Sequence, residues 1–147
     1  MLDLRAALLN ISRRWNYKLD EVSPEVWRLD VAIPLKEGNP RYQFVYIWIA
    51  KGRWFNKHDC IYINSRCGQY MPTLDLYNLM KEGGYGFYTT VTVTTDKDKD
   101  GNPCETVIAQ ASPVLDWTTP ELLNEIIYEV AYNADIIEER YFGGDNN

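Results

Sequence analysis

The chain has little of the two residue types that bind most structural metals, histidine and cysteine. It has one histidine, His58, so no second imidazole is present to share a metal or to act as a second base. Its three cysteines cannot all pair with one another, and the spacing of Cys60, Cys67 and Cys104 matches no zinc-binding pattern. We therefore expect no metal site, no cofactor and no disulfide framework, and we expect reduced thiols in a cytoplasmic protein.

The sequence also lacks long apolar runs and an excess of positive charge. No stretch reaches the roughly 18 apolar residues that a membrane-spanning helix requires, and Met1–Arg5 has neither the basic leader nor the apolar run of a signal peptide. Its 15 Lys and Arg residues face 21 Asp and Glu residues, which gives a formal net charge of −6. Because nucleic-acid binding depends on clustered basic side chains, we expect neither a nucleic acid nor a membrane as partner.

Apolar and aromatic residues are abundant. The hydrophobic fraction is 46% and the aromatic fraction is 14%, with 5 Trp and 11 Tyr. This composition supports a packed core and argues against disorder. A chain of 147 residues has the size of one domain, so we predict a single domain over residues 1–147.

An amphipathic helix is predicted at each end of the chain. The apolar residues of Leu4–Trp15 recur at spacings of four, three and four. Near the other end, Thr118 or Thr119 can cap a helix whose first turn contains Pro120, and apolar residues then recur at helical spacing up to Tyr141. The same helix carries acidic residues that we expect to be solvated: Glu121, Glu125, Glu129, Asp135, Glu138 and Glu139.

Five strands and one short helix are predicted between the two terminal helices. The strands are Trp27–Leu35, Tyr42–Ala50, Cys60–Arg66, Tyr85–Thr95 and Glu105–Ser112. The short helix is Pro72–Lys81, and the polar segment Asp20–Pro24 is expected to be irregular. Because most connections between the strands are short, neighbouring strands should be antiparallel. The prediction is an α+β protein with the element order α-β-β-β-α-β-β-α.

The histidine, cysteines and glycines do not form a pattern typical of an active site. On an extended segment His58 and Cys60 share one face while Asp59 points to the other, so no third group orients a histidine base. The segment Gly83–Gly86 is not followed by a Lys-Ser or Lys-Thr pair, so it predicts a helix stop rather than a phosphate-binding loop. We predict no catalytic residue and no enzymatic activity.

The loop Asp96–Gly101 matches the opening of a calcium-binding loop, with acidic residues at positions 1, 3 and 5 and glycine at position 6. However, Val107 stands where such a loop needs a bidentate glutamate, and Pro103 interrupts its second half. The flanking segments are also predicted strands rather than helices. A charged hairpin tip is the preferred interpretation, and cation binding stays open.

The predicted strand Tyr42–Ala50 is apolar on both faces. One face carries four aromatic residues, namely Tyr42, Phe44, Tyr46 and Trp48, and Trp54-Phe55 follows further along the chain. The stripe either packs in the core of a covered sheet or forms an exposed platform for a partner. These four residues are the predicted partner-binding residues.

The element order resembles that of the class I chaperones of type III secretion. The segments Ser112–Asp116 (SPVLD), Thr119–Leu123 (TPELL) and Asn133–Asp135 (NAD) are similar to the end of domains in the bacterial sensory-transduction-regulator family, which is thought to share that fold. The resemblance implies a strongly twisted, five-stranded antiparallel sheet with both long helices packed on one face. It also implies no enzyme signature.

The same resemblance implies a homodimer that binds an extended segment of a protein partner. The dimer contact maps to the short middle helix and the strand after it, and so to Leu76, Met80 and Tyr88. The leading hypothesis is a non-enzymatic protein-binding module that acts as a chaperone, adaptor or regulator. Two alternatives stay open: a small-ligand-binding protein or enzyme with a pocket between sheet and helices, and an immunity-type protein that neutralises a toxin.

Overall fold

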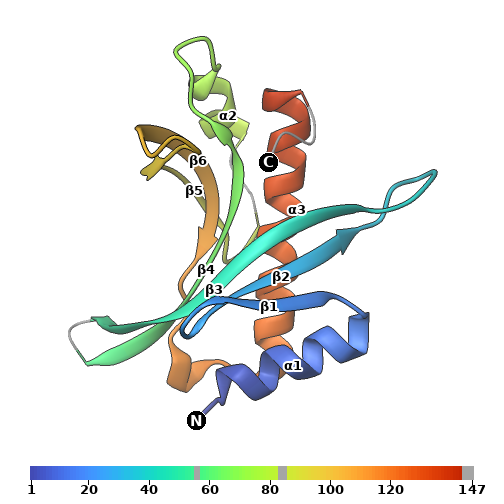
Figure 1. Ribbon diagram of the computed structural model, residues 1–147, viewed down its shortest axis with the longest axis vertical. Helices are drawn as coiled ribbons and strands as arrows, with labels where there is room; N and C mark the ends of the chain where they lie inside the picture. The colour runs from blue at the N-terminus through green and yellow to red at the C-terminus, as the bar shows by residue number, and fades with distance from the viewer. Residues whose placement is uncertain (55–56, 83–85, 144–147) are drawn as a thin grey trace.

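The computed structural model describes residues 1–54, 57–82 and 86–143, apart from the side chains of residues 53 and 54. In these residues the chain forms, in order, α1 (Leu4–Trp15), β1 (Lys18–Ser23), β2 (Val26–Ile33), β3 (Arg41–Trp54), β4 (His58–Gln69), α2 (Leu76–Glu82), β5 (Thr90–Lys97), β6 (Pro103–Ala111), the 3-10 helix η1 (Leu115–Trp117) and α3 (Pro120–Phe142) (Figure 1). Of the predicted aromatic pair, the Trp54 side chain and Phe55 lie outside this description, as does the predicted helix stop at Gly83-Gly84.

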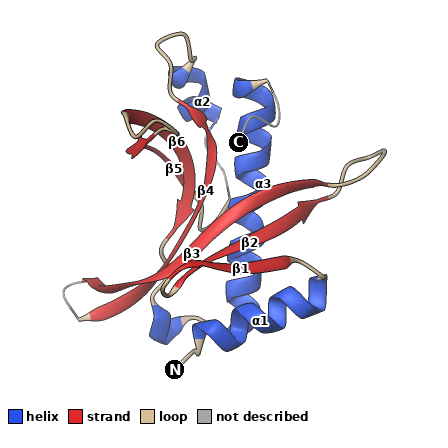
Figure 2. Cartoon of the chain, viewed as in Figure 1, coloured by secondary structure: helices blue, strands red, loops and turns tan. Residues whose placement is uncertain are grey.

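The strands form one antiparallel sheet with the order β1-β2-β3-β4-β6-β5 (Figure 2). The prediction of an α+β protein with an antiparallel sheet is confirmed. The prediction of five strands is wrong, because residues 18–23 form a sixth strand at the edge of the sheet. This segment is polar because an edge strand can leave most of its side chains in water, and charged residues there also discourage pairing with other chains.

Local hydrogen bonds set the ends of the helices. Asp3 caps α1 by accepting a hydrogen bond from the backbone N–H of Ala6 at 3.1 Å. Of the two threonines that could cap the last helix, Thr119 does so, accepting from the N–H of Leu122 at 3.1 Å. α2 begins at residue 76 and not at 72, because the Asp75 carboxylate accepts from the N–H of Asn78 at 3.1 Å.

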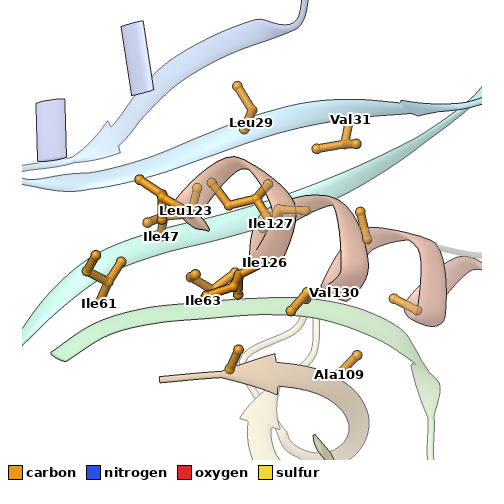
Figure 3. Close-up of a cluster of buried hydrophobic side chains, with 14 of the residues drawn as sticks. Leu29, Val31, Ile47, Ile61, Ile63, Ala109, Leu123, Ile126, Ile127 and Val130 are labelled. Atoms are coloured by element: carbon orange, nitrogen blue, oxygen red, sulfur yellow. The ribbon is translucent and has the colours of Figure 1, made fainter. Parts of the chain in front are cut away.

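The core lies between the sheet and the helices. The buried residues of β2 alternate with half-buried ones, so one face of this strand is in the core. Figure 3 shows Ile47 of β3 and Ile63 of β4 directed toward Leu123 and Ile126 of α3. Leu8 of α1 belongs to the same buried cluster. Within the described residues, no helix combines the length and the apolar content needed to cross a membrane.

Strands β3 and β4 separate at one end of the sheet, where β4 continues toward β6 and α2 while β3 continues toward β2 (Figure 1). Their regular pairing runs from Tyr46 opposite Asn64 to Ala50 opposite Cys60. Beyond it, side chains replace backbone pairing. The amide of Gln43 donates to Ser65 Oγ and to the carbonyl of residue 66, both at 3.0 Å, and Ser65 Oγ donates to the carbonyl of residue 44 at 2.8 Å.

The acidic residues of α3 are not all solvated, contrary to the sequence prediction. Glu121, Glu125 and Glu139 are exposed, as predicted, but Asp135 and Glu138 are 5% and 2% exposed. Asp135 accepts two hydrogen bonds from Arg41 of β3, at 3.0 Å from Nε and 2.7 Å from Nη2. The ion pair attaches the first residue of β3 to α3 at the end of the sheet where β3 has separated from β4.

Glu129 is the third exception, and it explains why the predicted strand Tyr85–Thr95 starts later, at Thr90. Its half-buried carboxylate accepts hydrogen bonds from three consecutive backbone N–H groups, those of Phe87, Tyr88 and Thr89, and from Thr89 Oγ1. Burial raises the pKa of Glu129, but these hydrogen bonds outweigh it and leave the pKa below its ordinary value. Residues 87–89 are therefore bound to α3, and within the described part of this segment the strand begins at Thr90.

Candidate functional site

The face of the sheet opposite α1 and α3, which we call the outer face, carries the aromatic stripe. Along β3, residues 43, 45 and 47 are buried on the helix side, and the aromatic residues alternate with them. Tyr42 is 53% exposed and Phe44 is 36% exposed, while Tyr46 and Trp48 are half-buried. None of the four rings belongs to the buried cluster. The interpretation of this stripe as core is therefore wrong, and its rings lie at the surface.

The outer face is hollowed in two adjoining places that share Tyr46 and Arg66. The larger hollow, which we call the sheet groove, has a volume of about 560 Å³ and extends from β3 across β4 and β6 to β5. Trp48, Tyr62 and Asn64 line it on one side, and residues 94–96 of β5 line it on the other. The smaller hollow, of about 250 Å³, lies where β3 and β4 separate; Tyr42 and Phe44 line it, and so do Gln43 and Glu138 of α3 from the helix side.

Neighbouring side chains hold the rings of the stripe in place. Trp48 and Tyr62 lie opposite each other on β3 and β4, with ring centroids 4.7 Å apart. The Tyr62 hydroxyl donates to Gln110 Oε1 at 2.5 Å. The guanidinium of Arg28 lies 4.8 Å from the centroid of the Phe44 ring. Rings held in this way lose little conformational entropy when a partner binds.

Charges of both signs border the stripe. Arg28 donates to Asp30 and Asp20, each at 3.1 Å. Burial lowers the pKa of Arg28, but the two carboxylates outweigh this and raise it. Arg66 of β4 pairs with Asp96 of β5 and so crosses β6, which lies between these strands. The outer face thus combines aromatic surface with charged groups that can bind polar parts of a ligand.

The residues weighed as catalytic lie elsewhere. His58 Nδ1 is 3.9 Å from Asp116 Oδ2, and its ring centroid is 5.1 Å from that of Trp117. Cys60 is buried, and its backbone forms an isolated antiparallel β-bridge with residue 114. Burial and the nearby Glu138 raise the pKa of Cys67 to about 12, although a backbone N–H partly offsets them. That thiol stays protonated at neutral pH and is a poor nucleophile.

The loop Asp96–Gly101 is the tip of the β5–β6 hairpin, as preferred from the sequence. Asp98 Oδ1 accepts from the backbone N–H groups of Asp100 and Asn102, both at 2.9 Å, which is the hydrogen bonding of a tight turn. Asp96 is paired with Arg66. Across the described part of the chain, no three His, Cys, Asp or Glu side chains are grouped so that they could hold a metal ion.

The three predicted dimer residues lie at two places. Leu76 is half-buried and Met80 is 54% exposed, both on α2, while Tyr88 is 46% exposed in the segment before β5. Both places are attached to α3: the first through the ion pair between Glu82 and Arg140 at 3.2 Å, the second through Glu129. Met80 and Tyr88 therefore present exposed apolar surface on segments that the fold holds in place.

Sequence reasoning missed the contribution of β4 to the site. Tyr62, Asn64 and Arg66 alternate along β4 on the face that carries Trp48 on β3. The alternation is visible in the sequence, where buried residues 61, 63 and 65 separate them. What the sequence does not show is the strand order, which places β4 between the aromatic stripe and β5.

Comparison with known proteins does not assign the chain to a family. A scan against protein-family models finds no match. A search of the curated proteins finds no relative. Function is therefore argued from the geometry of the outer face.

Proposed function

We propose that this protein is a non-enzymatic, cytoplasmic protein-binding module that holds an extended segment of a partner protein on its outer face. The observation that carries the proposal is the aromatic stripe of β3, which lies at the surface on the face of the sheet opposite α1 and α3. Tyr and Trp side chains dominate the binding energy of many protein interfaces. A role as chaperone, adaptor or regulator follows from this kind of binding.

The form of the hollows supports an extended segment as the ligand. The sheet groove crosses from β3 to β5, and the smaller hollow adjoins it at Tyr46 and Arg66, so the two hollows offer neighbouring places for one ligand. Successive side chains of an extended peptide point to opposite sides, so alternate residues could enter these hollows. Arg28, Arg66 and the carboxylates beside them could bind backbone or polar groups of the same peptide.

We also propose that the fold is chaperone-like, as the resemblance implies. What supports this is a helix at each end of the chain, an antiparallel sheet, and a short helix after the fourth strand. The additional edge strand β1 is a departure from the implied five strands. Among the described residues, buried apolar side chains of the sheet and of the helices form one cluster between the two layers.

Self-association through Leu76, Met80 and Tyr88 is part of the proposal. Sedimentation velocity over a wide concentration range measures it, and Met80→Ser combined with Tyr88→Ser should shift the protein toward the monomer. Both side chains are about half exposed, so these substitutions leave the core intact. A wild-type protein that stays monomeric at high concentration would contradict the homodimer without affecting the proposed peptide site.

A peptide-display selection tests the proposed function. Random peptides are selected on the wild-type protein, and their affinities are measured for Phe44→Ala/Trp48→Ala and for Tyr77→Ala. Tyr77 is the matched control, because it is an exposed aromatic residue on α2 that lines neither the sheet groove nor the smaller hollow. We expect the double variant to lose at least about tenfold in affinity and the control to be unchanged. Selected peptides that bind both variants equally well would contradict the proposal.

A further inference from the structure

A second, larger groove lies away from the outer face. It has a volume of about 850 Å³ and is formed by the C-terminal end of α1, the β2–β3 hairpin and the first half of α3. In Figure 1 the hairpin and the end of α1 lie on the same side of α3. Four aromatic side chains line the groove, namely Trp15, Tyr17, Tyr128 and Tyr132, and the loop between β2 and β3 lines it on the hairpin side through Pro34 and Pro40.

The aromatic rings of this groove are accessible and close together. Trp15 and Tyr132 are 47% and 46% exposed, and Tyr128 is 39% exposed. The rings of Tyr128 and Tyr132 are stacked, with centroids 6.1 Å apart. Partial burial, together with its proximity to Tyr128, raises the pKa of Tyr17, so this hydroxyl is neutral at physiological pH.

The charge of the groove is of one sign. Its lining includes two carboxylates, those of Glu125 and Glu129, and none of the described residues that line it is lysine, arginine or histidine. Glu129 already accepts the hydrogen bonds of residues 87–89, whereas Glu125 is exposed on α3. Arg14, whose guanidinium lies 5.3 Å from the Trp15 ring, lines a neighbouring depression that shares Trp15, Asn124 and Glu125 with this groove.

We propose that this groove is a binding site for a small apolar or aromatic molecule that carries an ammonium group. Its volume is within the range of about 300–1,000 Å³ that is typical of small-molecule sites. The apolar part of the ligand lies among the tyrosines and Trp15, where ring faces attract a cation, and the ammonium group lies beside Glu125. A ligand with a negative group would face two carboxylates and no compensating cation.

The test uses three probes of one shape and different charge: 1-naphthylmethylammonium, 1-naphthalenemethanol and 1-naphthoate. Calorimetric titration of the full-length protein measures the affinity of each. We expect the ammonium probe to bind at least about tenfold more tightly than the naphthoate, with the neutral alcohol between them. Equal affinities for the ammonium and the naphthoate, or no saturable binding of the ammonium, would overturn the proposal.

Two surface variants locate the binding. Glu125→Gln should lower the affinity for the ammonium probe by about threefold or more and leave the neutral alcohol unchanged. Tyr132→Ala should weaken all three probes, because it removes an exposed ring from the groove without opening the core. Trp48→Ala on the outer face is the matched control and should leave the affinities for the three probes unchanged, because Trp48 does not line this groove. Loss of binding in that control, with none in Tyr132→Ala, would place the probes on the outer face and refute this site.

Discussion

Removing Arg41 should destabilise the protein far more than removing an ordinary surface arginine. Its guanidinium donates to both Asp135 oxygens, at 3.0 and 2.7 Å, and to Glu139 Oε2 at 2.9 Å. The hydrogen bonds to Asp135, which have the larger effect, and to Glu139 raise the pKa of Arg41 above its ordinary value. Only 6% of the Asp135 side chain is exposed, so the carboxylate left behind in Arg41→Ala is almost without solvent.

The expected loss of stability in Arg41→Ala follows from the burial of Asp135. Removing one partner of a buried ion pair costs about 3–5 kcal/mol, because an uncompensated charge is left in the interior. The Arg41 side chain is 24% exposed, so water can enter in its place, and we expect about 3 kcal/mol. Arg41→Lys keeps the charge but loses the two-pronged geometry, so it should cost about 1 kcal/mol.

Urea denaturation at pH 7 measures these free energies of unfolding. The matched control is Arg140→Ala, because Arg140 pairs with Glu82 at 3.2 Å but its side chain is 60% exposed. That pair should contribute less than about 1 kcal/mol. Arg41→Met with Asp135→Asn should recover part of the loss, because residue 135 is then no longer an uncompensated buried charge. If Arg41→Ala costs no more than the control, the ion pair does not attach β3 to α3 as described.

Three further predictions concern packing, pH and thiol reactivity. Gly68→Ala should cost about 1–3 kcal/mol, because the new Cβ would lie 2.4 Å from the Phe142 ring, and the cost should shrink in a Phe142→Leu background. Folding lowers the pKa of Glu129. The Glu129 carboxylate therefore contributes fully to stability at a pH above its ordinary pKa of 4.5, and this contribution is lost as the pH falls through the lower pKa of the folded protein. As the pH is lowered from 7 to 3, the free energy of unfolding should therefore fall less steeply for Glu129→Gln than for the wild type. An equal pH dependence in both proteins would refute this role. In native-state alkylation followed by mass spectrometry, the half-buried Cys104 should react first and Cys67 only on unfolding; the reverse order would contradict the burial of Cys67.

The terminal helices and most strands could be predicted because their signals are local. Apolar spacing and a capping threonine before Pro120 are read within a few residues of sequence. The edge strand β1 could not be predicted, because its side chains are mostly exposed and it lies at the end of the strand order, paired with β2. The burial of Asp135 also depends on a distant partner, since Arg41 lies 94 residues earlier in the chain.

Only part of the candidate site could be predicted from the sequence. Alternation along β3 predicts that Tyr42, Phe44, Tyr46 and Trp48 share a face, but it does not say whether a helix covers that face. Which strands complete the site depends on the strand order, and long-range pairing of β4 with β6 cannot be read from local pattern. The groove beside α3 is hidden for the same reason, because its lining comes from three distant segments.

The most direct test of the outer-face account is fluorine NMR of the protein labelled with 5-fluorotryptophan, titrated with a display-selected peptide. Trp48 reports on the sheet groove, and Trp15 reports on the groove beside α3. Each signal is assigned by its Trp→Phe variant. A shift of the Trp48 signal that saturates with the peptide, while the Trp15 signal stays in place, is the predicted result. Saturable peptide binding that leaves the Trp48 signal unmoved would contradict the proposal that the outer face is the binding site.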